Sequence, residues 1–282
     1  MLFRSYREKT APEGYQLDET VYKVKQTDDV KYNVREALDK KLSPGIKTFA
    51  TDVSTGSNIL SCSPEAKVID RIEYKNLEKG EEYRIKGHIV DKKTGKPLEI
   101  NGRRIEAEKS FRPASINGTE ELEYTLDSRL LKDRILVVFE EVFKDNVSVV
   151  SHTDVNDENQ TLLVPEIGTS ATDGKTGEHM TEYSKEAKII DRVSYKNLVP
   201  GIEYTVSGIL MDAESGEAIL TEKGEKITNT LAFTPESPDG NVDVEFTVDS
   251  KFLTGKTVVA FENCFFKGVR ISYHEEIGRA HV

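Results

Sequence analysis

The sequence predicts an all-β fold built as two tandem immunoglobulin-like β-sandwiches. Three observations predict it: a long internal repeat, short segments in which apolar and polar residues alternate, and turn signals at short intervals between these segments. No stretch of ten residues shows a convincing helical apolar period. At 282 residues, of which 37% are hydrophobic, the chain is long enough for about two domains, each with its own core.

The internal repeat defines the domains. The matching segments are 46–52 with 167–173, 67–95 with 188–216, and 125–143 with 247–265. One unit is therefore about 120 residues long, which is the size of a small domain rather than of a solenoid repeat. We expect one sandwich at 43–164 and a second at 165–282, joined near Pro165 by so short a linker that the two form a rod.

Alternating segments and turns within each unit indicate short strands. The runs EEYRIKGHIVD (81–91) and VDVEFTV (242–248) alternate, and turn signals stand at TGK (94–96), ESGE (214–217) and SPDGN (237–241). This pattern is typical of a sandwich.

Composition excludes several classes of function. The net charge is −11 and the acidic residues are spread along the chain, which argues against nucleic-acid binding. Cys62 and Cys264 lie in different repeats without counterparts, and no His/Cys cluster is present, so we expect no disulfide, metal or cofactor. The sequence contains no run of about 20 apolar residues, the length that a membrane helix needs. Its start lacks the apolar core of a signal peptide. We therefore expect an internal piece of a longer exported protein.

Polar residues occupy apolar faces of the first repeat. Alternation places Thr48 with Ile46 and Ala50, and puts four more polar residues on inward faces of their segments. These four are Asp70, Glu140, His152 and Gln160. Burying such groups unpaired costs a few kcal/mol each, so they should meet one another. Each residue alone has an ordinary structural explanation; the set of five favours chemistry.

The second repeat keeps four members of this set. They are Thr169, Asp191, Glu262 and His274. The position of Gln160 falls on Val282, within a terminal IGRAHV that resembles a translated sequencing adapter. We therefore expect an incomplete second sandwich, without its last strand, and a degenerate site without an acyl partner.

The five residues of the first repeat fit one reaction. A threonine hydroxyl is a weak nucleophile that needs a neighbouring base, and a glutamine carboxamide needs its carbonyl polarised. Two carboxyl groups held close cannot both ionise, so Asp70 or Glu140 should keep a proton. That proton can go to the oxyanion or the leaving ammonia, while His152 or the ionised carboxylate takes the proton of Thr48. The product is one ester and one ammonia per molecule.

The motifs ATD, IDRIEYKNL, VVFEE and SHTDVNDENQT resemble the VaFE-repeat, Thr–Gln ester-bond domains of Gram-positive surface adhesins. The resemblance implies that Thr48 is the nucleophile and Gln160 the acyl donor. It also implies that Glu140 is the main acid/base residue, Asp70 its carboxyl partner and His152 an activating base. No cofactor is implied.

The first 42 residues resemble a different module. The run REKTAPEGYQLDETVYKVK is similar to the end of a Cna-B (SpaA-type) domain. Glu8 stands where that family keeps the glutamate that promotes a Lys–Asn isopeptide bond. The lysine would precede Met1, so this bond is not expected here.

The resulting hypothesis is a structural stalk segment of an extracellular, cell-wall-anchored adhesin or pilus-like protein, whose partners are neighbouring stalk domains. Two alternatives stay open. One is a ligand-binding adhesin module whose loops recognise a host protein or glycan. The other is a turnover enzyme, an amidase or a transglutaminase-like protein, that uses Thr48.

Overall fold

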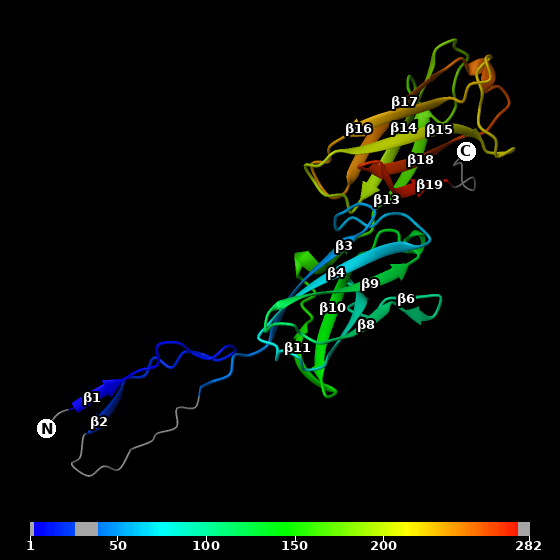
Figure 1. The fold of residues 1–282 in the computed structure, drawn as a ribbon. Coiled ribbons are helices and arrows are strands. Elements are labelled where there is room, and N and C mark those ends of the chain that lie inside the picture. The colour runs from blue at the N-terminus through cyan, green and yellow to red at the C-terminus, as the bar shows by residue number, and fades with distance from the viewer. Residues whose placement is uncertain (1–2, 26–38, 276–282) are drawn as a thin grey trace.

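The computed structural model describes residues 3–25 and 39–275, and it confirms the all-β prediction. Two β-sandwiches follow one another end to end, and a small N-terminal hairpin extends away from the first (Figure 1). The only helices among the described residues are three short 3-10 turns. None of the described helices is long and apolar enough to cross a membrane.

The first sandwich consists of a three-stranded and a five-stranded sheet. The three-stranded sheet has the order β3 (Gly45–Asp52), β4 (Ala66–Lys75), β9 (Gly118–Leu126). The five-stranded sheet has the order β11 (Val147–His152), β10 (Ile135–Lys144), β5 (Tyr83–Asp91), β8 (Glu106–Phe111), and β12 (Thr161–Leu163) pairs with the other half of β10. The connections contain η1 (Ser128–Leu130), η2 (Glu158–Gln160) and a small ribbon of β6 (Glu99–Ile100) and β7 (Arg103–Arg104).

The second sandwich repeats this plan. One sheet has the order β13 (Glu166–Asp173), β14 (Ala187–Lys196), β17 (Gly240–Val248). The other has the order β16 (Thr228–Phe233), β15 (Tyr204–Asp212), β18 (Val258–Phe266), β19 (Val269–His274), and η3 (Ser250–Phe252) corresponds to η1. Up to residue 275 this sandwich has no counterpart of η2 and β12. Val282, at the position of Gln160, lies outside the described residues.

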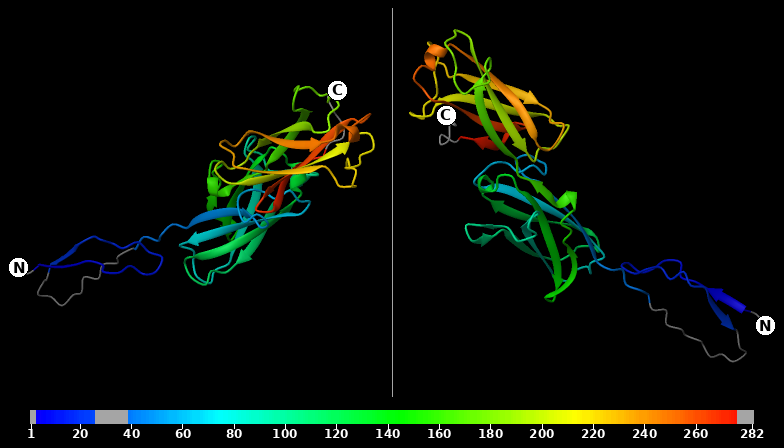
Figure 2. Two further views of the ribbon diagram at one scale, coloured as in Figure 1. Left: turned by 90° about the horizontal axis from the view of Figure 1, so that it is seen from above. Right: turned by 180° about the vertical axis from the view of Figure 1, so that it is seen from behind.

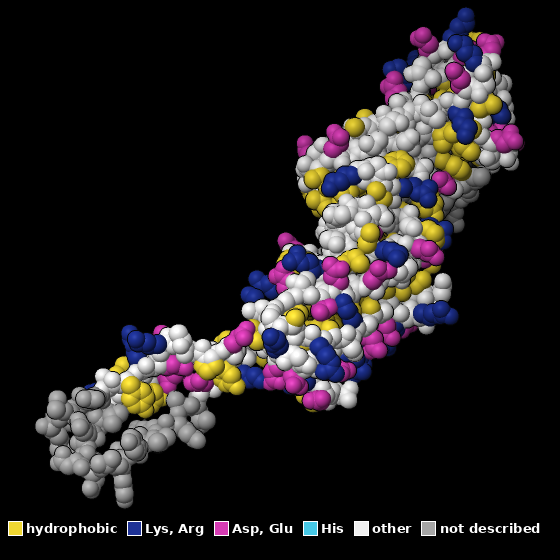
Figure 3. Space-filling model, in the orientation of Figure 1, with side chains coloured by type: hydrophobic (Ala, Val, Ile, Leu, Met, Phe, Trp, Pro, Cys, Tyr) yellow, Lys and Arg dark blue, Asp and Glu magenta, His cyan; other side chains and the backbone are white. Residues whose placement is uncertain are grey.

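Alternation builds each core as the sequence predicted. In β4, Val68, Ile72 and Tyr74 are buried between the sheets while Lys67 and Arg71 are exposed. Charged side chains of both signs are interspersed over the outer surface (Figure 3). Burial of one face of each strand against the opposite sheet therefore drives the fold.

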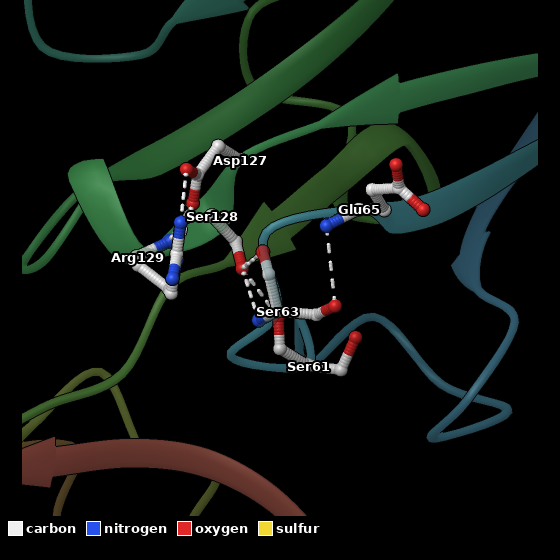
Figure 4. A network of polar contacts seen from close by, with 6 residues as sticks. All are labelled: Ser61, Ser63, Glu65, Asp127, Ser128 and Arg129. Carbon is white, nitrogen blue, oxygen red and sulfur yellow. Dashed lines mark hydrogen bonds and ion pairs between the residues drawn. The ribbon is translucent and has the colours of Figure 1, made fainter.

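A serine at the start of η1 fixes the loop between β3 and β4. Ser128 Oγ donates to the carbonyl oxygens of Ser61 (2.6 Å) and Ser63 (3.0 Å), and accepts from the Ser63 backbone N–H at 2.9 Å. Figure 4 shows this network. Ser250 repeats part of it by accepting from the Ser184 N–H at 2.8 Å.

The same loop between β3 and β4 joins the two sandwiches. Ile59 is 1% exposed and belongs to the core of the second sandwich, whereas Leu60, also 1% exposed, belongs to the core of the first. The Cys62 N–H donates to the Arg270 carbonyl oxygen across the junction at 2.8 Å. The contact between the sandwiches is also visible from behind, in the right view of Figure 2.

These two adjacent residues give a matched test of the junction. Ile59→Ala should destabilise the second sandwich by about 2–5 kcal/mol, because it leaves a cavity in that core. Leu60→Ala should instead destabilise the first by a similar amount. Hydrogen-exchange mass spectrometry checks this: Ile59→Ala should speed exchange in β14 and β17, and Leu60→Ala in β4 and β9. Identical exchange patterns in the two variants would contradict the junction.

Candidate functional site

The structure brings the predicted residues of the first repeat together between the two sheets. Thr48 comes from β3, Asp70 from β4 and Glu140 from β10, and these three are 2%, 0% and 1% exposed. Gln160 ends η2 and is 0% exposed. His152, at the end of β11, is half-buried and pairs in strand register with Glu140.

Gln160 differs from the prediction in its local structure. Alternation placed it on the last strand, with Leu162 and Val164, but it is the last residue of the 3-10 turn η2. Asp157 begins this turn and accepts a hydrogen bond from the Asn159 N–H at 2.8 Å. The turn packs against β3, the strand of Thr48. It directs the carboxamide inward, where Gln160 Nε2 donates to Asp70 Oδ1 at 3.2 Å.

The two carboxyl groups are perturbed by burial and by one another. Burial raises the pKa of Glu140 well above its usual range, and the negative charge of Asp70 raises it further. Burial also raises the pKa of Asp70, while the hydrogen bond from Gln160 opposes that shift. Glu140 is therefore the member of the pair that holds the proton at neutral pH.

Several polar atoms of the site make no hydrogen bond in the structure. They are Thr48 Oγ1, Asp70 Oδ2, both carboxyl oxygens of Glu140 and Gln160 Oε1. An unpartnered buried polar atom costs about 1–3 kcal/mol, so the cluster depends on a proton on Glu140, which lets that group bond to Asp70. The atoms of this cluster are those that an ester-forming reaction would use.

Asp157 is a polar residue of this site that the sequence analysis did not single out. Its Oδ2 lies 2.8 Å from His152 Nε2, while its carboxylate also begins η2. One side chain thus links the imidazole to the turn that carries Gln160. Its place in SHTDVNDENQ, between the histidine and the glutamine, was the available signal.

A family model decides the family of this chain. The model for the T-Q ester bond containing domain matches residues 44–164 and again residues 165–280. The chain belongs to this family. The matched ranges contain both sandwiches, so each is a T-Q domain.

The solved structures that match this chain are distant. Two crystal forms of an adhesin from Mobiluncus mulieris, which contains intramolecular disulfide, isopeptide and ester bond cross-links, match with 12% identity and a TM-score of 0.36, covering 80% of this chain and 82% of that one. A β-glucuronidase from Bacteroides uniformis matches with 9% identity and a TM-score of 0.28, covering 74% of this chain and 26% of that one. No curated protein matches significantly.

The second T-Q domain brings its four predicted residues into the same arrangement. Asp191 and Glu262 are both 0% exposed, and their carboxyl oxygens are unpartnered. Burial raises the pKa of Glu262 to about 11, and Asp191 adds to the shift. Thr169 and His274 are half-buried.

The remaining predicted residues are placed elsewhere. Glu8 lies beside the hairpin of β1 (Phe3–Tyr6) and β2 (Tyr22–Lys25), and its carboxylate accepts from the Asp18 N–H at 2.7 Å. Cys62 and Cys264 are free thiols. Within residues 3–25 and 39–275, no group of three His, Cys, Asp or Glu side chains could hold a metal ion.

The buried Glu262 predicts a pH-dependent stability for the second T-Q domain. Its pKa is higher in the folded than in the unfolded chain, so its contribution is complete below about pH 4.5 and is lost as pH rises toward about 11. The free energy of unfolding should therefore fall with rising pH by at most about 1.4 kcal/mol per pH unit. Thermal unfolding at increasing pH should show this decline, and Glu262→Gln should reduce it. Glu245→Gln, at an exposed residue paired with Lys188, is the control that should leave the slope unchanged.

Proposed function

We propose that this chain is a structural stalk segment of a bacterial surface adhesin, and that its first T-Q domain forms an ester between Thr48 and Gln160. The observation that supports this most strongly is the convergence of Thr48, Asp70, Glu140 and Gln160 in a buried site where Gln160 already contacts Asp70. The family match supports the same conclusion.

The arrangement of the carboxyl groups supplies a proton path. Thr48 Oγ1 attacks the Gln160 carboxamide carbon, the C–N bond breaks, and the Thr48 proton must reach the leaving nitrogen. Neutral Glu140, which has the Thr48 hydroxyl and Asp70 as polar neighbours, passes its proton to Asp70 and takes the proton of Thr48. Asp70 then protonates the nitrogen that it already contacts. One ester and one ammonia result, and Glu140 regains its starting state.

His152 favours the starting charge state of this path. When protonated, its charge lowers the pKa of Asp70, so it favours an ionised Asp70 beside a neutral Glu140. The contact with Asp157 holds the imidazole at this edge of the site. His152 thus promotes the reaction through its charge, from the edge of the core.

Burial argues against a turnover enzyme. Thr48, Asp70, Glu140 and Gln160 are at most 2% exposed, so an external amide cannot reach the hydroxyl. A single intramolecular reaction needs no such access. Rigid strands supply the orientation instead.

The ester would stabilise a load-bearing domain. It closes a loop of about 110 residues, which the chain-entropy model for disulfides values at roughly 4–5 kcal/mol. It also joins the first strand of the sandwich to the turn that precedes its last strand. The junction through Ile59 keeps consecutive domains aligned, as a stalk requires. We place the chain outside the cell, as one segment of a longer wall-anchored protein.

The ester itself is directly testable. Intact-mass spectrometry of the purified protein should show the loss of one ammonia, and digestion should yield one cross-linked pair of peptides that contains Thr48 and Gln160. Thr48→Ala should retain the full mass of its sequence. A folded wild-type protein whose mass equals that of its sequence, without loss of ammonia, would falsify the proposal.

Glu140 should be required for fast cross-linking of Thr48 to Gln160. Glu140→Gln keeps the size of the side chain but cannot relay a proton, so cross-linking should slow by a factor of about 10² or more. Glu141→Gln, at the next residue of β10 and outside the site, should cross-link like the wild type. The time course of ammonia loss measures both variants, and an unchanged rate in Glu140→Gln would refute the assigned role.

A further inference from the structure

Tyr124 lies beside the two carboxyl groups, and the reaction described above gives it no role. It belongs to β9, where it pairs in register with Val68, two residues from Asp70. Its side chain is 1% exposed, and its hydroxyl makes no hydrogen bond in the structure. A phenylalanine would pack there without leaving a buried hydroxyl unpartnered.

Gly87 makes room for this hydroxyl next to Glu140. Gly87 on β5 is the register partner of Glu140 on β10. A Cβ atom on Gly87 would lie 1.9 Å from Tyr124 Oη. The phenol therefore crosses from one sheet to the other and ends at the strand position of Glu140.

The electrostatics make Tyr124 a hydrogen-bond donor. Burial raises its pKa, and the negative charges of Glu140 and Asp70 raise it further. The phenol therefore keeps its proton in the presence of either carboxylate. A neutral hydroxyl beside a carboxyl pair that carries one negative charge can donate to that charge.

The second T-Q domain shows that the fold does not need the hydroxyl. Phe246 occupies the equivalent position on β17, and a Cβ on Gly208 would lie 2.7 Å from its Cζ. Gly208 is in turn the register partner of Glu262. The same ring packs over the same glycine in both domains, but only the first domain has the hydroxyl.

We propose that Tyr124 is a positioning residue for ester formation: its O–H, unpartnered in this structure, donates to the single negative charge shared by Asp70 and Glu140 when that pair relays the proton. This inference rests on the proposed function. The hydrogen bond stabilises the singly ionised pair that relays the proton, and Tyr124 itself neither gains nor loses a proton. Removing a donor from the charged form makes ionisation harder, so the reaction should then require a higher pH.

The test compares full-length wild type with Tyr124→Phe. Each protein is captured in denaturant before it cross-links and refolded over a series of pH values, and the loss of ammonia is followed by mass spectrometry. Tyr124→Phe should react about tenfold more slowly at neutral pH, and the midpoint of its pH–rate profile should lie about one unit higher. Tyr74→Phe is the control, because the charge that acts on that buried tyrosine is Glu120; it should behave like the wild type.

The outcomes separate this inference from the ester itself. Wild-type protein that never loses ammonia refutes the cross-link. Wild-type protein that cross-links, with an unchanged rate or an unchanged pH midpoint in Tyr124→Phe, overturns the role of Tyr124 alone. A double variant, Thr48→Ala with Tyr124→Phe, should unfold within a few degrees of the unfolding temperature of Thr48→Ala alone. If the double variant fails to fold, Tyr124 has a packing role and the proposal is overturned as well.

Discussion

Burial of two carboxyl groups between the sheets is the constraint on which the site depends. Asp70 and Glu140 come from opposite sheets, so packing the sandwich forces them together. Neither can be fully solvated there, and both cannot ionise at once. The pair must share a proton, and the Gln160 carboxamide supplies one of its few polar contacts. Folding thus creates the protonation state that an ester-forming reaction needs.

The second T-Q domain contains an equivalent buried carboxyl pair, so the pair accompanies the fold. Asp191 and Glu262 are as deeply buried as Asp70 and Glu140. The threonines differ between the domains: Thr169 is half-buried, whereas Thr48 is 2% exposed beneath the turn that carries Gln160. The turn η2 therefore both brings Gln160 to the site and covers Thr48, and this exclusion of water strengthens the electrostatic interactions within the site.

Features that repeat with a regular period could be predicted from the sequence. Alternation along strands correctly placed Thr48, Asp70 and Glu140 on inward faces, and the repeat identified their counterparts. Periodicity could not predict η2, because a single 3-10 turn has no period and Gln160 fits an alternating strand equally well. It also missed Ile59, since a loop residue buried in the core of the neighbouring domain leaves no local signal. Asp157 escaped notice because a residue that begins a turn resembles any other loop aspartate.

The positions of Thr48 and Gln160 along the chain determine how tension would pass through the domain. In a stalk, force would enter at Gly45, where β3 begins, and would leave through β12, whose Leu163 lies just before the next domain. β12 pairs with β10 over three residues only, so without a cross-link this short ladder would be a weak point. An ester between Thr48 and Gln160 connects the third residue after Gly45 directly to the residue that precedes β12. The load then bypasses β4, β5, β9 and β10, and the core that holds the carboxyl pair carries none of it.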